Sequence, residues 1–169
     1  MVPVCPRRPA KILSRPILAC LGVFLLAATD LDGADRVDAP AARPEQRVQA
    51  IVDELSRELS LTREVVAAVV AENPRVVSVQ PPADRRGAFR LSFEAQFLDA
   101  LSDDELRAAV AHELGHVWIF TNHPYLHTER LANQIAMRVV SRESLARVYE
   151  KLWARGGGGK GHIGRFLGD

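Results

Sequence analysis

Apolar residues recur every three or four positions from Glu45 to about residue 72, with a break at residues 60–62. This spacing is typical of amphipathic helices that bury one face. Thr62 has a side chain that can cap a second helix after the interruption. The pattern therefore predicts two short helices whose apolar faces pack in the core. The apolar residues are Val48, Ile51, Val52, Leu55 and Leu59 in the first helix and Leu61, Val65, Val66, Val69 and Val70 in the second.

The pattern becomes strand-like after Pro74, which ends the second predicted helix because the residue before a proline disfavours helical backbone angles. Residues 76–79 predict a short strand and residues 88–93 a second one, with a polar turn at 81–87 between them. A hairpin is the natural pairing of two such strands. Residues 94–100 then predict a short helical turn.

A longer helix is predicted from Ser102 to about residue 120. Ser102 and Glu105 have the spacing of a capping box, in which each side chain pairs with the backbone N–H of the other residue. The acidic residues 103–104 favour the positive end of the helix dipole. An apolar stripe follows, formed by Leu106, Ala109, Val110, Leu114, Val117 and Trp118. The sequence His-Glu-Leu-Gly-His at 112–116 is therefore expected on a helix.

Two further helices complete the predicted fold. Residues 121–127, which include Pro124, form a compact loop, and Thr128 can cap a helix that runs through Val140. Another helix is predicted at 144–154. Together the elements predict a small, mostly helical α+β domain with a short β-hairpin or sheet packed on the long helix.

The first 28 residues have the layout of a secretory signal peptide. Basic residues precede the apolar run Ile17–Ala28, which is shorter than the roughly 20 residues of a membrane-spanning helix. We expect cleavage near Ala28 or Ala34 and export of the domain, to the periplasm or to the medium. The alternative is an uncleaved leader that anchors the domain to the membrane.

Three regions follow the predicted signal peptide at 1–28. Residues 29–44 are rich in Asp, Ala, Arg and Pro and predict a linker. Residues 45–155 contain all the predicted helices and strands and form one domain. The glycine-rich residues 156–169 predict a flexible tail.

The composition narrows the possible chemistry of the domain. Cys5 and Cys20 are the two cysteines and both lie in the leader, so any metal must be held by His, Asp or Glu. Removal of the leader leaves 18 basic and 21 acidic residues, a net charge of −3. Nothing in this balance indicates nucleic-acid binding.

His112 and His116 are four residues apart on the predicted helix, so both imidazoles can face one metal ion. Glu113 lies one step round the helix, where it can face a metal-bound water and act as a general base. A catalytic zinc ion takes three protein ligands and one water, and we expect one zinc ion per chain. The alternative is a solvated helix face that binds no metal.

A third ligand is needed downstream of His116. The extended motif HExxHxxGxxH would place glycine at 119 and histidine at 122, where this chain has Ile119 and Asn122. His123 and His127 are therefore expected in the loop, near the metal at most as outer contacts.

Glu129 is the better candidate for the third ligand. It lies in the first turn of the helix after the loop, so it can stand level with His116 across the helical hairpin. Asn133 shares its face, and the side-chain oxygen of Asn133 can accept the free ring N–H of His112 or His116. The alternative for Glu129 is a first-turn acid that the helix dipole stabilises.

The residues 112–116, followed by Glu-Arg-Leu-Ala-Asn at 129–133, resemble the HExxH plus ExxA[DN] pattern of gluzincin metallopeptidases. The preceding stretch, residues 89–111, resembles the lead-in of the CAAX-prenyl-protease-like branch. The resemblance implies a zincin-like fold in which strand 88–93 is the sheet edge that binds an extended peptide. It also implies zinc ligands at His112, His116 and Glu129 and a catalytic base at Glu113.

The chain departs from this pattern in two places. Asn133 stands where an acid is usual, and 12 residues separate His116 from Glu129, fewer than in that branch. These differences bear on the substrate range more than on zinc binding.

The expected function is peptide-bond hydrolysis by a zinc-dependent metalloendopeptidase acting on a peptide or protein. Tyr125, His127 and His123 are candidates for an oxyanion donor or substrate contact, and the sequence does not rank them. The alternative is an exported zinc-binding or degenerate domain that serves as a non-catalytic interaction module. The sequence identifies no protein partner, and contact with a membrane is expected only through an uncleaved leader.

Overall fold

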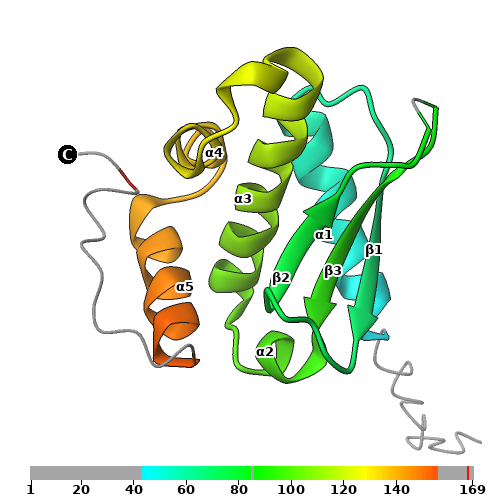
Figure 1. The fold of residues 1–169 in the computed structure, drawn as a ribbon. Coiled ribbons are helices and arrows are strands. Elements are labelled where there is room, and N and C mark those ends of the chain that lie inside the picture. The colour runs from blue at the N-terminus through cyan, green and yellow to red at the C-terminus, as the bar shows by residue number, and fades with distance from the viewer. Residues whose placement is uncertain (1–42, 85, 156–166, 168–169) are drawn as a thin grey trace, which may run out of the picture. The chain divides into compact units, whose positions relative to one another are not determined.

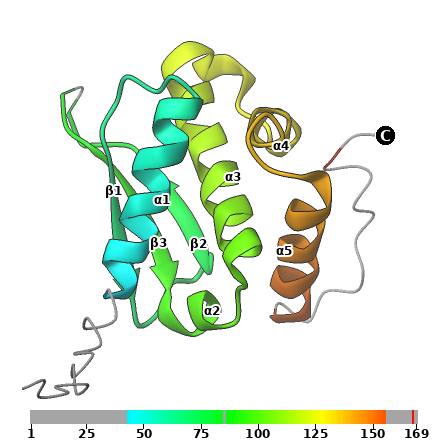
Figure 2. The same ribbon diagram turned by 180° about the vertical axis from the view of Figure 1, so that it is seen from behind.

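Helix α1 (Pro44–Glu58) opens the part of the chain that the computed structural model describes, which comprises residues 43–84, 86–155 and 167. It confirms the first predicted helix. Its buried face consists of Val48, Val52 and Leu55. Figure 1 shows α1 behind a small sheet, and the reverse view in Figure 2 shows it in front. This helix therefore covers one face of the sheet.

Residues 65–70 form strand β1 (Val65–Val70), so the second helix predicted for this region is wrong. β1 pairs in parallel with strand β3 (Phe89–Glu94), from Val65 opposite Phe89 to Val70 opposite Glu94. Four of the six residues of β1 are valines, whose branched side chains favour a strand over a helix. A short apolar run satisfies the spacing of either element, and the pairing with β3 decides in favour of the strand.

The three strands form one mixed sheet in the order β1-β3-β2. Strand β2 (Val77–Gln80) pairs with β3 in antiparallel orientation, which confirms the predicted hairpin. Because β1 occupies the other side of β3, that strand lies in the middle of the sheet, and the expectation that residues 88–93 form its edge is wrong. The free edge on the side of the long helix belongs to β2.

Helix α3 (Asp103–Asn122) runs through the centre of the described fold (Figure 1) and contacts α1, β2 and the two helices that follow it. The short helix α2 (Ala95–Asp99) precedes it and confirms the predicted helical turn. The capping box is also confirmed: the Ser102 hydroxyl accepts the Glu105 N–H at 3.4 Å, and the Glu105 carboxylate accepts the Ser102 N–H at 2.7 Å.

Helix α4 (Glu129–Ala136) begins directly after Thr128, whose hydroxyl accepts a backbone N–H three residues later at 3.2 Å, as the sequence predicts. It ends short of the predicted limit at Val140. The N–H groups of Arg138 and Val139 each donate to the carbonyl oxygen three residues earlier, so the helix ends in a tighter turn.

A 3-10 turn, η1 (Pro124–Leu126), lies in the loop between α3 and α4. The last helix of the described residues is α5 (Arg142–Arg155), which includes the predicted residues 144–154. Ser141 caps its first turn, because the Ser141 hydroxyl accepts the Ser144 N–H at 3.1 Å. Together these elements confirm a small, mostly helical α+β domain.

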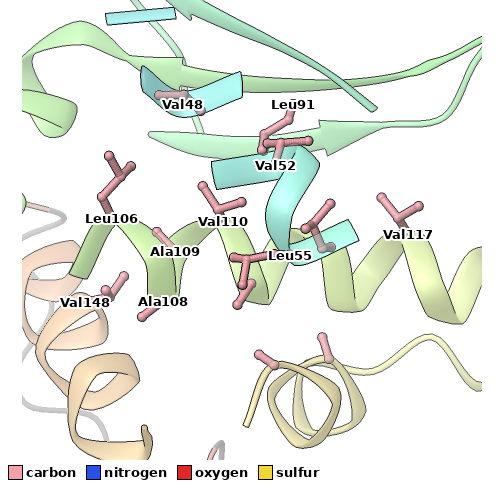
Figure 3. Packing of buried hydrophobic residues seen from close by; sticks show 14 of the residues in the cluster. Val48, Val52, Leu55, Leu91, Leu106, Ala108, Ala109, Val110, Val117 and Val148 are labelled. Carbon is pink, nitrogen blue, oxygen red and sulfur yellow. The ribbon is translucent and has the colours of Figure 1, made fainter. Parts of the chain in front are cut away.

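Apolar side chains from α1, β3, α3 and α5 fill the core. In Figure 3, Val110 of α3 points toward Val52 of α1 and Leu91 of β3, and Ala108 lies on the side of α5. Because α1 contacts β1 while α3 contacts β2, the two helices cover the sheet side by side. This arrangement places the middle of α3 beside the free edge of β2.

Three predicted regions lie outside the described residues: the signal peptide at 1–28, most of the linker at 29–44 and nearly all of the tail at 156–169. Within the described ranges, no helix has both the length and the apolar character that a membrane span requires.

Candidate metal centre

Two histidines of α3 and one glutamate of α4 bring their polar atoms together. The Nε2 atoms of His112 and His116 are 3.1 Å apart. The Glu129 carboxylate reaches both rings, with Oε2 3.2 Å from Nε2 of His112 and Oε1 3.5 Å from Nε2 of His116. One ligand atom from each residue lies within 4.8 Å of the others, so these three side chains could hold a metal ion. Two imidazoles and a carboxylate are a donor set found in catalytic zinc sites.

Local features of the two helices produce this convergence. His112 and His116 lie one helical turn apart on the same face of α3. Glu129 lies in the first turn of α4, directly after the Thr128 cap. The two helices pack closely because Gly115 has no side chain at the point where it faces the backbone of Ala132.

Asn133 orients the ring of His112. Its Oδ1 lies 2.7 Å from Nδ1 of His112, so the ring N–H donates to this oxygen and Nε2 is directed toward His116 and Glu129. Asn133 is completely buried. The sequence left open which histidine Asn133 contacts, and the structure selects His112. The Nδ1 atom of His116 is buried and has no hydrogen-bond partner among the described residues.

The electrostatics of the cluster suit a cation. Hydrogen bonds from His112 and then His116 hold the pKa of the Glu129 carboxyl far below its usual range, despite partial burial. Burial lowers the pKa of His112, but its hydrogen bond to Glu129 and the charge of Glu113 outweigh that effect and raise the pKa above the ordinary value. Glu129 is therefore held as a carboxylate that faces both rings.

Glu113 is buried next to the three clustered side chains and lines the same cavity. Burial raises the pKa of its carboxyl, while the nearby His112 and His116 act in the opposite direction. A backbone hydrogen bond with Val79 of β2 contributes a smaller lowering. Glu113 is thus a buried acid held between α3 and the edge strand.

The sequence model of peptidase family M48 matches residues 42–166, which is more than half of the chain. The chain belongs to peptidase family M48. Membership confirms the predicted resemblance to zinc metallopeptidases and makes this chain a metallopeptidase at the level of its family. No curated protein and no solved structure matches the chain.

The candidate metal centre of this M48 domain opens into a cavity of about 630 Å³. Its walls come from β2, the start of β3, α3, α5 and the loop after α3, and they are mainly apolar. Away from the centre, the lining includes Val77, Val79, Phe89, Ala109, Phe120, Pro124, Leu145, Val148 and Leu152. A cavity of this size and composition is typical of ligand-binding sites.

The predicted outer residues of the M48 domain separate in the structure. His127 lines the cavity, and its ring centroid lies 4.8 Å from that of His116. Tyr125 is almost fully exposed, and His123 packs against Trp118, with 5.6 Å between ring centroids. Neither Tyr125 nor His123 lines the cavity. Of these three candidates, His127 is the one that the fold brings to the centre.

Sequence reasoning missed Tyr149. Its hydroxyl hydrogen-bonds to Asn133, its ring lies 5.8 Å from that of His112, and it lines the cavity. Tyr149 shares the apolar helical spacing of α5 with Leu145, Val148 and Leu152, and all four pack in or against the core. A tyrosine in such a stripe requires a partner for its hydroxyl, and that requirement is the signal that could have identified it.

Proposed function

We propose that this M48 chain is a zinc-dependent metalloendopeptidase in which Glu113 is the general base. The observation that carries the proposal is the convergence of His112, His116 and Glu129 beside a buried acid, in a cavity next to a free strand edge. Each of these parts has a defined use in peptide-bond hydrolysis.

The donor set fits a zinc ion. Two imidazole nitrogens and one carboxylate make three ligands, which leaves a fourth position for water or substrate. When bound, zinc acts as a Lewis acid that lowers the pKa of water and polarises a carbonyl group. Asn133 would fix the ring of His112 for this role, since its oxygen already accepts the N–H on the far side of that ring.

Glu113 has the position and environment of a proton carrier. As a carboxylate it takes a proton from the attacking water, and as a carboxylic acid it gives that proton to the leaving amine. Burial raises the pKa of its carboxyl, so the protonated form is easier to reach than in an exposed glutamate.

The free edge of β2 supports binding of an extended peptide. The Glu94 N–H donates to the Val76 carbonyl at 2.8 Å, so Val77 and Val79 turn their backbone groups away from β3. The Val77 N–H donates to the Arg75 carbonyl at 2.7 Å. We infer that the carbonyl oxygens of Val77 and Val79 accept N–H groups of the substrate, by addition of a strand at this edge.

The test measures zinc content and peptide hydrolysis with the purified full chain. We expect about one zinc per chain in the wild type and in Glu113→Gln, with hydrolysis of a mixed peptide library by the wild type and none by Glu113→Gln. His116→Ala is expected to lose both zinc and activity. Glu150→Gln is the matched control, because Glu150 is an exposed acid on α5.

Each result has a distinct meaning. Bound zinc without hydrolysis of any peptide in the wild type would replace the enzyme by a non-catalytic zinc-binding module. Equal activity in the wild type and Glu113→Gln would remove Glu113 from the proposed mechanism. Absence of zinc from the wild type, with zinc supplied throughout purification, would refute the metal centre.

A further inference from the structure

The Tyr149 hydroxyl contacts both ends of the Asn133 amide. The Asn133 Nδ2 group donates to the hydroxyl at 2.9 Å, and the hydroxyl lies 3.2 Å from Oδ1, to which it can donate. The same Oδ1 atom accepts the Nδ1–H of His112 at 2.7 Å. Three helices thus contribute to one chain of hydrogen bonds, with Tyr149 on α5, Asn133 on α4 and His112 on α3.

This chain of hydrogen bonds reaches only one of the two histidines. His112 is held through Nδ1, whereas Nδ1 of His116 has no hydrogen-bond partner among the described residues. In a metal-binding histidine, the ring nitrogen that does not bind the metal makes a hydrogen bond. That bond fixes the tautomer and the direction of the ring. Among the described residues, the ring of His112 is therefore the one that a hydrogen bond from outside the cluster orients.

Because residue 133 is an asparagine, the orientation of the His112 ring depends on which way the Asn133 amide faces. Aspartate would present two acceptor oxygens, whereas asparagine presents one acceptor and one donor. For Nε2 of His112 to face a metal, Nδ1 must carry the hydrogen and face Oδ1 of Asn133. The Nδ2 group then points the other way, and it requires an acceptor because Asn133 is completely buried.

We propose that Tyr149 is a positioning residue that fixes the Asn133 amide, whose oxygen faces His112, and thereby keeps Nε2 of His112 available to the metal. The inference rests on the proposed zinc site. Burial raises the pKa of Tyr149 to about 12, so the hydroxyl keeps its proton at neutral pH. The ring of Tyr149 also packs edge-on against that of His112, a contact that phenylalanine would retain.

The first test compares zinc dissociation constants, measured by competition with a chromophoric chelator, for the full chain and for Tyr149→Phe. We expect about tenfold weaker binding in the variant, the lower end of the range for loss of an outer contact of a ligand. Tyr125→Phe is the matched control, since Tyr125 is almost fully exposed, and it should bind zinc as the wild type does. Thermal unfolding of the zinc-free chains shows whether each variant is folded.

A double-mutant cycle tests whether Tyr149 acts through Asn133. In an Asn133→Ala background the amide is absent, so Tyr149→Phe should cause no further loss of zinc affinity. Losses that add in the double variant would overturn the proposal, because Tyr149 would then act independently.

A spectroscopic readout separates positioning from a general loosening of the fold. The ring ¹⁵N chemical shifts of His112 in the zinc-free chain report its tautomer. The population of the Nδ1–H tautomer should decrease in Tyr149→Phe and stay unchanged in Tyr125→Phe. Tight zinc binding by the wild type that Tyr149→Phe leaves unchanged would overturn this inference alone. A wild type that binds no zinc would overturn the proposed function, and this inference with it.

Discussion

A Cβ atom on Gly115 would lie 2.5 Å from the carbonyl oxygen of Ala132 and 3.0 Å from its carbonyl carbon. Gly115 directly precedes His116 on α3, and Ala132 directly precedes Asn133 on α4. This close contact between the two helices therefore adjoins His116, a candidate ligand, and Asn133, which orients His112. Any side chain at position 115 would have to push α4, and Glu129 with it, away from the histidines.

Gly115→Ala is expected to destabilise the zinc-free fold and to weaken zinc binding. Alanine favours a helix over glycine by about 1 kcal/mol, but the overlap involves backbone atoms that cannot rotate away, and overpacking typically costs about 1 to 3 kcal/mol. Thermal unfolding with and without zinc measures both effects. A raised melting temperature of Gly115→Ala would contradict the prediction, because helix propensity would then outweigh the contact with Ala132.

Asn133→Asp is expected to tighten zinc binding while it destabilises the zinc-free chain. A carboxylate beside Nδ1 of His112 makes that ring a stronger ligand. Without zinc, the same change places a charge in a completely buried position. Zinc competition and thermal unfolding of the metal-free chain measure the two effects separately, and a loss of zinc affinity would contradict the prediction.

Glu105 is expected to make the stability depend on pH at the acidic side. Burial would raise the pKa of its carboxyl, but hydrogen bonds from Lys151 and from Ser102 bring it below the ordinary value. A folded-state pKa below that of the unfolded chain stabilises the fold above the unfolded-state pKa. This stabilisation is lost as the pH falls through the folded-state pKa.

Glu105→Gln tests this pH dependence. The free energy of unfolding of the variant should be lower by about 1 to 2 kcal/mol at pH 7. The loss is modest because Lys151, whose Nζ lies 2.6 Å from the Glu105 carboxylate, is partly exposed to water. Its stability should also fall less than that of the wild type on acidification below about pH 5. Denaturant unfolding from pH 3 to 7 measures both, with the exposed Glu143→Gln as control. Parallel pH profiles for Glu105→Gln and the wild type would contradict the assignment.

Gln49 of α1 covers part of the outer edge of β1. Its Oε1 accepts the Ala67 N–H at 2.8 Å, and its Nε2 donates to the Val65 carbonyl at 3.1 Å. Gln49→Ala would leave these groups open along an apolar strand, and exposed edges of this kind pair with other chains. We expect concentration-dependent self-association by analytical ultracentrifugation. Gln134→Ala, an exposed position on α4, is the control, and a monomeric Gln49→Ala would refute this role of Gln49.

The sequence predicted the helices and the caps better than the sheet. Ser102, Thr128 and their partners are local features within three residues, and the structure forms both caps as expected. The strand at 65–70 depends on pairing with residues 89–94, which no local pattern contains. The same non-local pairing moves β3 from the edge to the middle of the sheet, so that β2 takes the edge position beside α3.

The candidate centre divides in the same way. His112 and His116 follow from helical spacing, and Glu129 follows from a capped helix after a short loop. Tyr149 could not be assigned, because its relation to Asn133 depends on how α5 packs against α3 and α4. Periodicity places a tyrosine on a buried face but does not identify the partner of its hydroxyl.

The shortness of β2 sets a limit on what the proposed enzyme can hold. Four residues at roughly 3.4 Å each span about 14 Å, and only Val77 and Val79 turn their carbonyl oxygens outward. A substrate can therefore form backbone hydrogen bonds with this edge over only a few residues, and those residues must be extended and accessible. Most residues of a well-folded protein are already engaged in helices, sheets or packed turns. This edge would thus select first for a locally unfolded segment of the substrate, and the side chains of that segment would matter only afterwards.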